Sequence, residues 1–97
     1  MVYKEVQDMK IVKNAVAGTL ESSDVYVEVH PGDKTQIVIE SVVAAQFEEA
    51  IMQTAQQMLD KFGVTGVHVV LKDRGALDCT IRARLETALR RAAAKED

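Results

Sequence analysis

Apolar and polar residues follow a short-period pattern over much of the chain. Three segments place valine, isoleucine or leucine at every second position, which is the period of a half-buried strand. A fourth segment, AVAGTL, is a short continuous apolar run bounded by polar residues. The pattern therefore predicts strands at residues 15–20, 25–30, 35–40 and 67–71.

Turn-forming residues separate the first three of these strands. ESSD, at residues 21–24, is a cluster of small polar residues whose side chains bond readily to nearby backbone groups, so it predicts an exposed turn. PGDK, at residues 31–34, joins a fixed proline φ to a permissive glycine. We expect it to connect the strands on either side of it as a hairpin.

A helical period replaces the alternation from about Val42 to Phe62. Apolar residues recur there at intervals of three and four, opposite glutamine and acidic residues. Ser41 is the expected N-cap, and Gly63 is suited to the left-handed position that ends a helix. The predicted buried face consists of Phe47, Ile51, Ala55, Met58, Leu59 and Phe62.

The segment that follows KDRG fits two periods. Apolar residues take every second position from Leu77 to Leu85, yet Leu77, Ile81 and Leu85 also share a helical face with later alanines. Because KDRG suits a type I turn with a bulge, we favour a strand over residues 76–84, paired as a second hairpin. The alanine-rich remainder, ETALRRAAAKED, predicts a C-terminal helix.

These elements follow in the order β-β-β-α-β-β-α, which predicts an α+β fold. We expect a small single-domain sandwich, with a mostly antiparallel sheet of β-hairpins covered by a central and a C-terminal helix. Residues 1–13 show no sustained period and are expected to form an extended leader. The domain itself is expected to span residues 14–97.

Charge and composition narrow the class of partner. Twelve basic and fifteen acidic residues give a net charge of -3, which disfavours nucleic acid and anionic membrane surfaces. Only two tyrosines and two phenylalanines are available to stack on bases. No apolar run is long enough to span a bilayer, and the single cysteine has no internal disulfide partner. We expect a cytoplasmic protein that binds neither nucleic acid nor membrane.

Catalytic and metal sites are not indicated. His30 and His68 lie at polar positions of their strands and are expected to be solvated, while Cys79 lies among apolar positions and is expected to be buried. Their dispersed positions match no metal-ligand motif or nucleophilic triad, so we predict no metal and no catalytic residue. A basic group near the C-terminus is either a solvated edge or a surface for an acidic partner: Arg82, Arg84, Arg90 and Arg91.

Two motifs in register carry a family resemblance. GTLESSDV, from Gly18 to Val25, and DRGALDCTIRARLETALRRA, from Asp73 to Ala92, resemble the two signature regions of the citrate lyase acyl carrier protein (gamma subunit). Apolar strands and a central helix lie between them in the same order and at similar spacing. The resemblance covers the chain from about Met9 to Ala94.

The resemblance implies a covalently attached arm and a non-catalytic role. The family's prosthetic group is a phosphoribosyl dephospho-CoA, of the 2'-(5''-triphosphoribosyl)-3'-dephospho-CoA type, joined by a phosphodiester to the serine that matches Ser22 here. Ser23 stands where the family often has glycine, so two adjacent hydroxyls are present. Asp24 beside them is expected to hold the turn or to steer the modifying enzyme.

The resemblance also implies partners and a reaction cycle. The transferase (alpha) subunit exchanges the acetyl thioester on the arm with citrate, giving a citryl thioester and acetate. The lyase (beta) subunit cleaves the citryl thioester to oxaloacetate and regenerates the acetyl form. A prosthetic-group transferase and an acetylating ligase load the carrier. Two alternatives stay open, a carrier of citramalate lyase or malonate decarboxylase and an unmodified α+β protein-interaction module.

Overall fold

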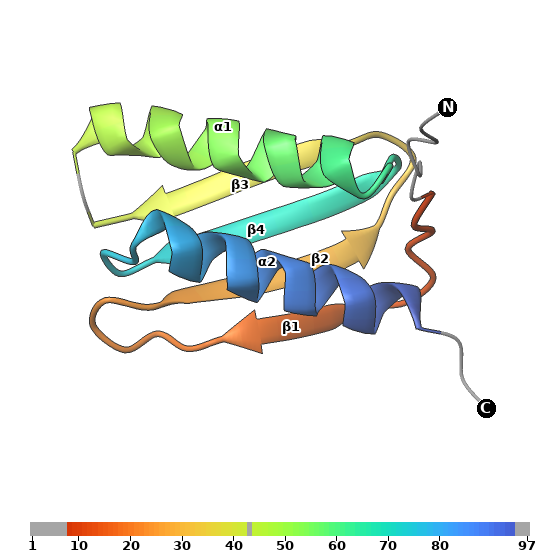
Figure 1. The fold of residues 1–97 in the computed structure, drawn as a ribbon, viewed down its shortest axis with the longest axis horizontal. Coiled ribbons are helices and arrows are strands. Elements are labelled where there is room, and N and C mark those ends of the chain that lie inside the picture. Colours follow the sequence, from red (N-terminus) through yellow and green to blue (C-terminus); the bar gives the residue numbers. More distant parts are fainter. Residues whose placement is uncertain (1–7, 43, 95–97) are drawn as a thin grey trace, which may run out of the picture.

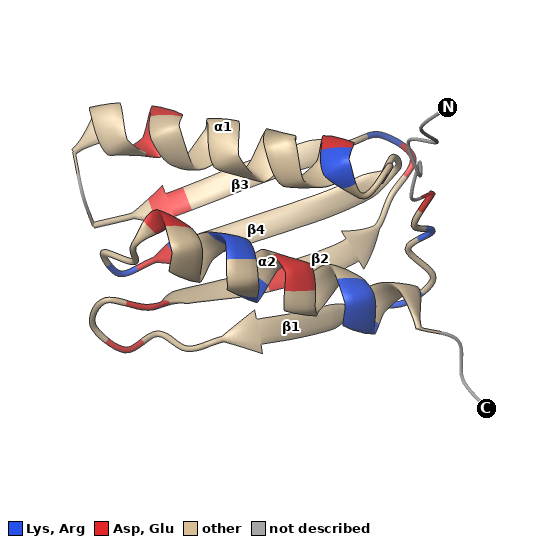
Figure 2. Ribbon diagram, viewed as in Figure 1, with Lys and Arg blue, Asp and Glu red and all other residues tan. Residues whose placement is uncertain are grey.

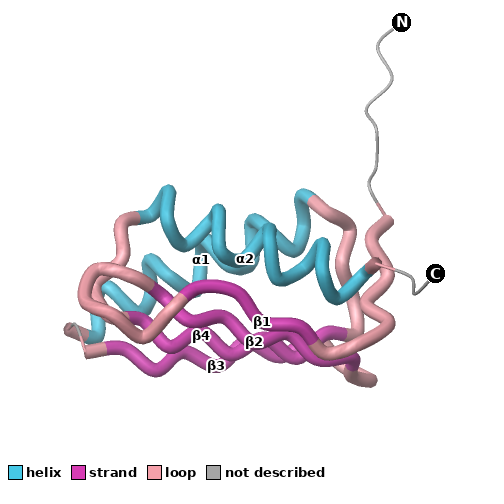
Figure 3. Tube along the Cα trace, turned by 90° about the horizontal axis from the view of Figure 1, so that it is seen from below, coloured by secondary structure: helices cyan, strands magenta, loops and turns pink. Residues whose placement is uncertain are grey.

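The computed structural model describes residues 8–42 and 44–94 of the chain. Both helices lie on the same face of one sheet, so the molecule has two layers (Figures 1 and 3). The layers follow from composition, since each element has one apolar face to bury. The elements are β1 (Ala15–Gly18), β2 (Val25–Pro31), β3 (Gln36–Ser41), α1 (Ala45–Lys61), β4 (Val67–Asp73) and α2 (Asp78–Ala93).

The sheet is mixed, with the strand order β1-β2-β4-β3. β1 pairs with β2 and β2 with β4 in antiparallel fashion, whereas β3 and β4 are parallel and are connected through α1. The predicted α+β class and mostly antiparallel sheet are confirmed. The predicted hairpin between residues 25–30 and 35–40 is wrong, because β4 lies between these two strands.

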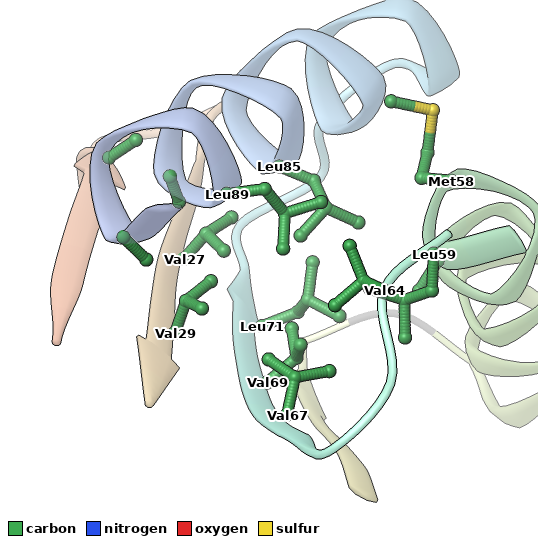
Figure 4. Close-up of a cluster of buried hydrophobic side chains, with 14 of the residues drawn as sticks. Val27, Val29, Met58, Leu59, Val64, Val67, Val69, Leu71, Leu85 and Leu89 are labelled. Carbon is green, nitrogen blue, oxygen red and sulfur yellow. The ribbon is translucent and has the colours of Figure 1, made fainter. Parts of the chain in front are cut away.

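The core lies between the sheet and the helices. β2 and β4 bury alternate side chains toward the helices, and residues of α1, α2 and the loop after α1 pack onto them (Figure 4). β4 is central and its apolar face is fully buried, while β3 at the sheet edge buries no residue completely. The side chains in the middle of this core are Val27, Val29, Val67, Val69, Leu71, Met58, Leu59, Leu85 and Leu89.

The predicted central helix exists but begins later and buries a narrower face than expected. Ala44 is its N-cap and makes no side-chain capping bond, so Ser41 is not the cap. Ser41 instead ends β3 and donates a hydrogen bond to Asp73. Phe47 is 54% exposed rather than buried. At the other end Gly63 has φ of 61°, which confirms its predicted left-handed position.

The segment predicted as a strand over residues 76–84 is helical from Asp78 onward. The helical period prevailed because it buries Ile81 and Leu85 together with the alanines and leucine that follow. Salt bridges at i,i+4 spacing join Asp78 to Arg82 and Glu86 to Arg90, at 2.6 and 2.8 Å. Cys79, predicted to be a buried strand residue, is therefore exposed on the first turn of α2.

The N-terminal segment contacts the far end of the molecule from the ESSD turn. The Met9 N–H donates to the Phe62 carbonyl at 2.9 Å, and Ile11 packs into the core with 8% exposure. Residues 1–7 of the predicted leader lie outside the described residues.

Among the described helices, none has both the length and the apolar character required to cross a membrane.

Candidate functional site

One end of the molecule brings together the two sequence motifs singled out above. The register pairs Val25, at the start of β2, with Asp73, at the end of β4. The β1–β2 loop, residues 19–24, therefore lies beside the β4–α2 loop, residues 74–77. Both helices also begin at this end (Figure 1). Residues far apart in the sequence thus form one continuous surface around the ESSD turn.

Ser22 lies in an exposed turn outside any regular element, which confirms the predicted location. No hydrogen bond links its side chain to any of the described residues. Ser23 differs, because its φ is 65° and its N–H donates to the Arg74 carbonyl at 2.8 Å. A left-handed φ favours glycine, which agrees with the glycine that the resemblance implies at this position. Ser23 therefore fixes the turn, while Ser22 projects from it.

Asp24 is the polar centre that holds this turn. Its carboxylate accepts two hydrogen bonds from the Arg84 guanidinium, both at 3.0 Å, and one from the Thr19 hydroxyl at 2.7 Å. The neighbouring Val25 N–H donates to it as well, at 2.7 Å. The Arg84 and Thr19 hydrogen bonds are the main reason why the pKa of Asp24 falls to about 2. The expected turn-holding role of Asp24 is confirmed by these contacts.

The Asp24–Arg84 pair connects the turn to α2. Figure 2 shows acidic residues in the β1–β2 loop and basic residues along α2. Asp24 is 9% exposed, so the carboxylate side of this bidentate ion pair is largely shielded from water. The backbone adds a second link, because the Arg74 N–H donates to the Asp24 carbonyl at 2.9 Å. The turn is therefore anchored to both the β4–α2 loop and the helix that follows it.

Gly18, the last residue of β1, lets the backbone pass close to Val25 of β2 where the β1–β2 loop begins. Its φ is 89°, and a Cβ there would overlap the carbonyl oxygen of Val25 on the opposite strand. A Cβ there would also lie 3.3 Å from the Arg84 side chain, which is closer than an ordinary van der Waals contact. A larger residue would therefore displace the start of β2 and, with it, the ion pair at Asp24.

The remaining sequence candidates lie elsewhere or are already engaged. His30 and His68 are cross-strand partners on the uncovered face of the sheet, with ring centroids 6.0 Å apart. No group of three or more potential metal ligands occurs within residues 8–42 and 44–94. The four C-terminal arginines each have intramolecular partners, which are Asp78 and Gln57 for Arg82, Asp24 for Arg84, Glu86 for Arg90, and the Val16 carbonyl for Arg91.

Sequence reasoning missed the residues that support the serine. Arg84 was read only as part of a basic group, because its partner lies 60 residues away in the chain. Thr19 lies in the apolar run and in the GTLESSDV motif, but the sequence assigns it no role of its own. A helical assignment of residues 78–93 would have placed Arg84 one turn from Ile81 and Ala88, beside the buried face of the helix. The family motif GTLESSDV contains three residues of this hydrogen-bonded group, Thr19, Asp24 and Val25.

Comparison with known proteins supports the resemblance. A family model described as "ACP: Malonate decarboxylase delta subunit (MdcD)" matches residues 12–92. The citrate lyase acyl carrier protein of Haemophilus influenzae (strain PittEE) is 55% identical over 84 residues, covering 87% of this chain and 88% of that protein. Its counterpart in Treponema denticola is 46% identical over 84 residues, covering 87% and 97%.

Solved structures extend the comparison to the fold. A chain of a Pseudomonas malonate decarboxylase hetero-tetramer has a TM-score of 0.71 and 19% sequence identity, covering 93% of this chain and 94% of that one. At this identity the likeness concerns the fold alone. The identities of about one half to curated relatives carry the closer assignment. The chain belongs to the citrate lyase acyl carrier protein family, whose members are carrier rather than catalytic subunits.

Proposed function

We propose that this protein is the acyl carrier subunit of a citrate lyase and that Ser22 bears its phosphoribosyl dephospho-CoA arm. The observation that carries the proposal is the contrast within the ESSD turn. The Ser22 side chain is exposed and makes no hydrogen bond to the described residues, whereas the next two residues, Ser23 and Asp24, are held by backbone hydrogen bonds to Arg74. A group that moves between separate active sites needs a free attachment point on a rigid support.

The residues present fit a covalently attached phosphodiester. An exposed serine hydroxyl can be reached by a modifying enzyme, and no described side chain covers it. When attached, the arm supplies a terminal thiol for thioester chemistry. The chain supplies the anchor and its orientation: Asp24 and Arg84 hold the base of the turn, and the Ser23 amide fixes its tip to Arg74. Tethering raises the local concentration of the acyl group at each partner site.

We further propose the partners and the setting that this role requires. The transferase (alpha) and lyase (beta) subunits are the sites that the arm visits, and a prosthetic-group transferase and an acetylating ligase load it. A hetero-tetrameric assembly is described for the malonate decarboxylase neighbour. The closer identity to citrate lyase carriers favours citrate over malonate as the substrate of the complex. A cytoplasmic setting agrees with a single exposed cysteine that has no disulfide partner.

Attachment to Ser22 is tested by a pair of adjacent substitutions. The protein is co-produced with the prosthetic-group transferase, and its intact mass is measured. Wild type and Ser23→Ala are expected to carry the adduct and to support citrate cleavage with the alpha and beta subunits. Ser22→Ala is expected to carry no adduct and to support no cleavage, because no other group presents the thioester. Loss of an exposed turn hydroxyl should change the free energy of unfolding by less than about 1 kcal/mol.

The reverse results have definite meanings. An adduct on Ser22→Ala that is absent from Ser23→Ala would move the anchor to Ser23. An adduct that persists when both serines are replaced would overturn the carrier assignment at this turn. Cleavage of malonyl rather than citryl substrate by the loaded complex would reassign the protein to the malonate decarboxylase branch of the family.

A further inference from the structure

A small pocket opens between the first halves of α1 and α2, at the same end of the molecule as Ser22. Its volume is about 290 Å³. Pockets for drug-sized ligands begin at roughly 300 Å³, so this one can hold only a short group. The lining is mainly apolar and includes Phe47, Ala50 and Ile51 from α1, Ile81 from α2, and Gly75 and Ala76 from the β4–α2 loop.

The pocket and the Ser22 turn share one loop. The Ser23 N–H donates to the carbonyl of Arg74, and the next two residues along the chain, Gly75 and Ala76, line the pocket. With about 3.8 Å between consecutive Cα atoms, this path places the pocket rim within about 15 Å of Ser22. An arm that joins a ribose phosphate, an adenosine diphosphate and pantetheine end to end is much longer than this. Its thiol end can therefore fold back to the pocket.

The polar groups of the pocket favour an uncharged occupant. Asp73 is 1% exposed, and its two carboxyl oxygens accept from the Ser41 hydroxyl and from the Ala76 N–H, both at 3.0 Å. The Thr54 hydroxyl donates to Asp78 at 2.6 Å, and Arg82 donates to the same carboxylate. These partners satisfy the polar groups internally. What faces an incoming ligand is apolar surface beside two acidic side chains.

The pairing of Asp78 with Arg82 supports this preference. The Thr54 hydrogen bond, followed by the Arg82 hydrogen bond, lowers the pKa of Asp78, so its carboxylate is charged at neutral pH. A neutral acyl group loses little on entering such a pocket. A carboxylate-bearing acyl group would lose its hydration there, and the Arg82 guanidinium that could attract it is already paired with Asp78 at 2.6 Å.

We propose that this pocket receives the uncharged acetyl-thioester end of the arm and rejects the citryl thioester. The inference rests on the proposed attachment to Ser22. In the acetyl state the folded-back arm is protected from water and from stray nucleophiles. Conversion to the citryl state releases it, so that the charged acyl group is presented outward to the lyase subunit. The position of the arm on the carrier therefore depends on the charge of the acyl group that it bears.

The test uses two caps of nearly equal size and different charge. The full chain carrying Cys79→Ser, which removes the exposed protein thiol, is loaded with the arm, and loading is verified by intact mass. The arm thiol is then alkylated with iodoacetamide, giving an uncharged cap, or with iodoacetate, giving a carboxylate. Methyl NMR signals of Ile51 and Ile81 report on the pocket. We expect clear shifts with the uncharged cap and shifts several-fold smaller with the carboxylate.

Matched variants locate the effect. Ala50→Phe fills the pocket from an exposed position and should remove the shifts. Ala83→Phe, at an exposed position of α2 outside the lining, should retain them. In the acetyl-loaded protein, hydroxylamine should cleave the thioester several-fold faster in Ala50→Phe than in Ala83→Phe.

The outcomes separate this inference from the proposed function. Full loading with pocket signals that the uncharged cap leaves unmoved, or that both caps shift equally, would overturn the inference while the carrier role stands. Equal hydroxylamine rates in the two alanine variants would also count against it. A protein that acquires no adduct at Ser22 in the presence of the transferase would remove the proposed function, and the pocket inference with it.

Discussion

The two loops at opposite ends of β2 are both exposed and rich in small polar residues, yet they are supported in different ways. The β2–β3 loop is held by two hydrogen bonds to Gly66, just before β4. The Gly32 N–H donates to the Gly66 carbonyl at 2.9 Å, and the Gly66 N–H donates to the Thr35 hydroxyl oxygen at 3.2 Å. The β1–β2 loop is held by a nearly buried carboxylate bound to a helix, and by the backbone of Arg74.

The difference explains how one loop can serve as an attachment point. A loop tethered only to another loop can shift with it. The base of the β1–β2 loop is connected both to the β4–α2 loop and, through Arg84, to α2, which belongs to the packed core. At its tip, the Ser22 side chain is exposed and makes no hydrogen bond to the described residues, so it can carry an attached group. Substitutions that weaken the base should therefore affect stability and modification together, and those at the opposite loop should affect neither strongly.

The largest effect on this comparison is expected from Gly18→Ala. Gly18 and Gly75 share a φ of 89°, but a Cβ would overlap the Val25 carbonyl oxygen at Gly18 and would meet no heavy atom within 4 Å at Gly75. Gly75→Ala should cost about 1 kcal/mol, from the left-handed backbone alone. Gly18→Ala should cost about 3 kcal/mol or more, because the start of β2 must also move. Urea unfolding measures both.

The same pair tests whether the base positions the anchor. Gly18→Ala should slow the loading of Ser22 by the prosthetic-group transferase, measured from the time course of the mass adduct. Gly75→Ala should load at close to the wild-type rate. Equal free energies of unfolding for the two variants would show that the backbone at Val25 moves away from the added Cβ without loss of stability. The base of the β1–β2 loop would then be less rigid than the Asp24 contacts indicate.

A smaller effect is expected from removing the charge of Asp24. Its pKa is lowered from 3.8 to about 2, chiefly by hydrogen bonds from Arg84 and Thr19. A carboxyl whose pKa is depressed in the folded state stabilises the fold above its unfolded pKa, and this contribution disappears as pH falls through the folded pKa. Asp24→Asn should therefore cost about 1–2 kcal/mol at pH 7, since Arg84 is partly exposed to solvent.

The pH dependence of this stability loss shows whether it comes from the missing charge of Asp24. The free-energy difference between wild type and Asp24→Asn should shrink between roughly pH 5 and pH 2, as measured by urea unfolding. Glu28 and Asp78 also have lowered pKa values, but both proteins retain them, so their contributions cancel. Asp33→Asn, at an exposed position of the β2–β3 loop, should change stability little at any pH. A difference that stays constant with pH would assign the loss at Asp24 to geometry rather than charge.

Local patterns in the sequence were sufficient to predict the strands, the central helix and the Ser22 turn. Each depends on neighbouring residues, such as the alternation in β2 and the small polar residues of ESSD. Pairing was not predictable in the same way. Turn chemistry at PGDK predicts a reversal of the chain, and the chain does reverse there. It cannot show that β4, whose apolar alternate positions fit the centre of the sheet, inserts between the two strands.

The wrong prediction of a strand over residues 76–84 has a physical cause in the residues themselves. Leu77, Ile81 and Leu85 satisfy both a two-residue and a helical period, and the choice depends on which partners the face meets. That choice also determines the support of the site, because Arg84 reaches Asp24 from α2. The serine was predictable from its local turn and the family motif. Its support was not, since the ion pair spans 60 residues of sequence.

The smallest effect, and the sharpest test of the turn geometry, is expected from Ser23→Gly compared with Asp33→Gly. Among the described residues other than glycine, Ser23 alone has a positive φ, of 65°. Glycine at Ser23 relieves about 1 kcal/mol of backbone strain but loses a similar amount to the greater freedom of the unfolded chain. Ser23→Gly should therefore be neutral or stabilising by up to about 0.5 kcal/mol, and Ser22 should load normally. Asp33→Gly has no strain to relieve and should lose about 0.5–1 kcal/mol. Equal losses in urea unfolding would mean that Ser23 does not hold a left-handed conformation in solution, and that the Ser22 turn is no more rigid than the loop at the opposite end of β2.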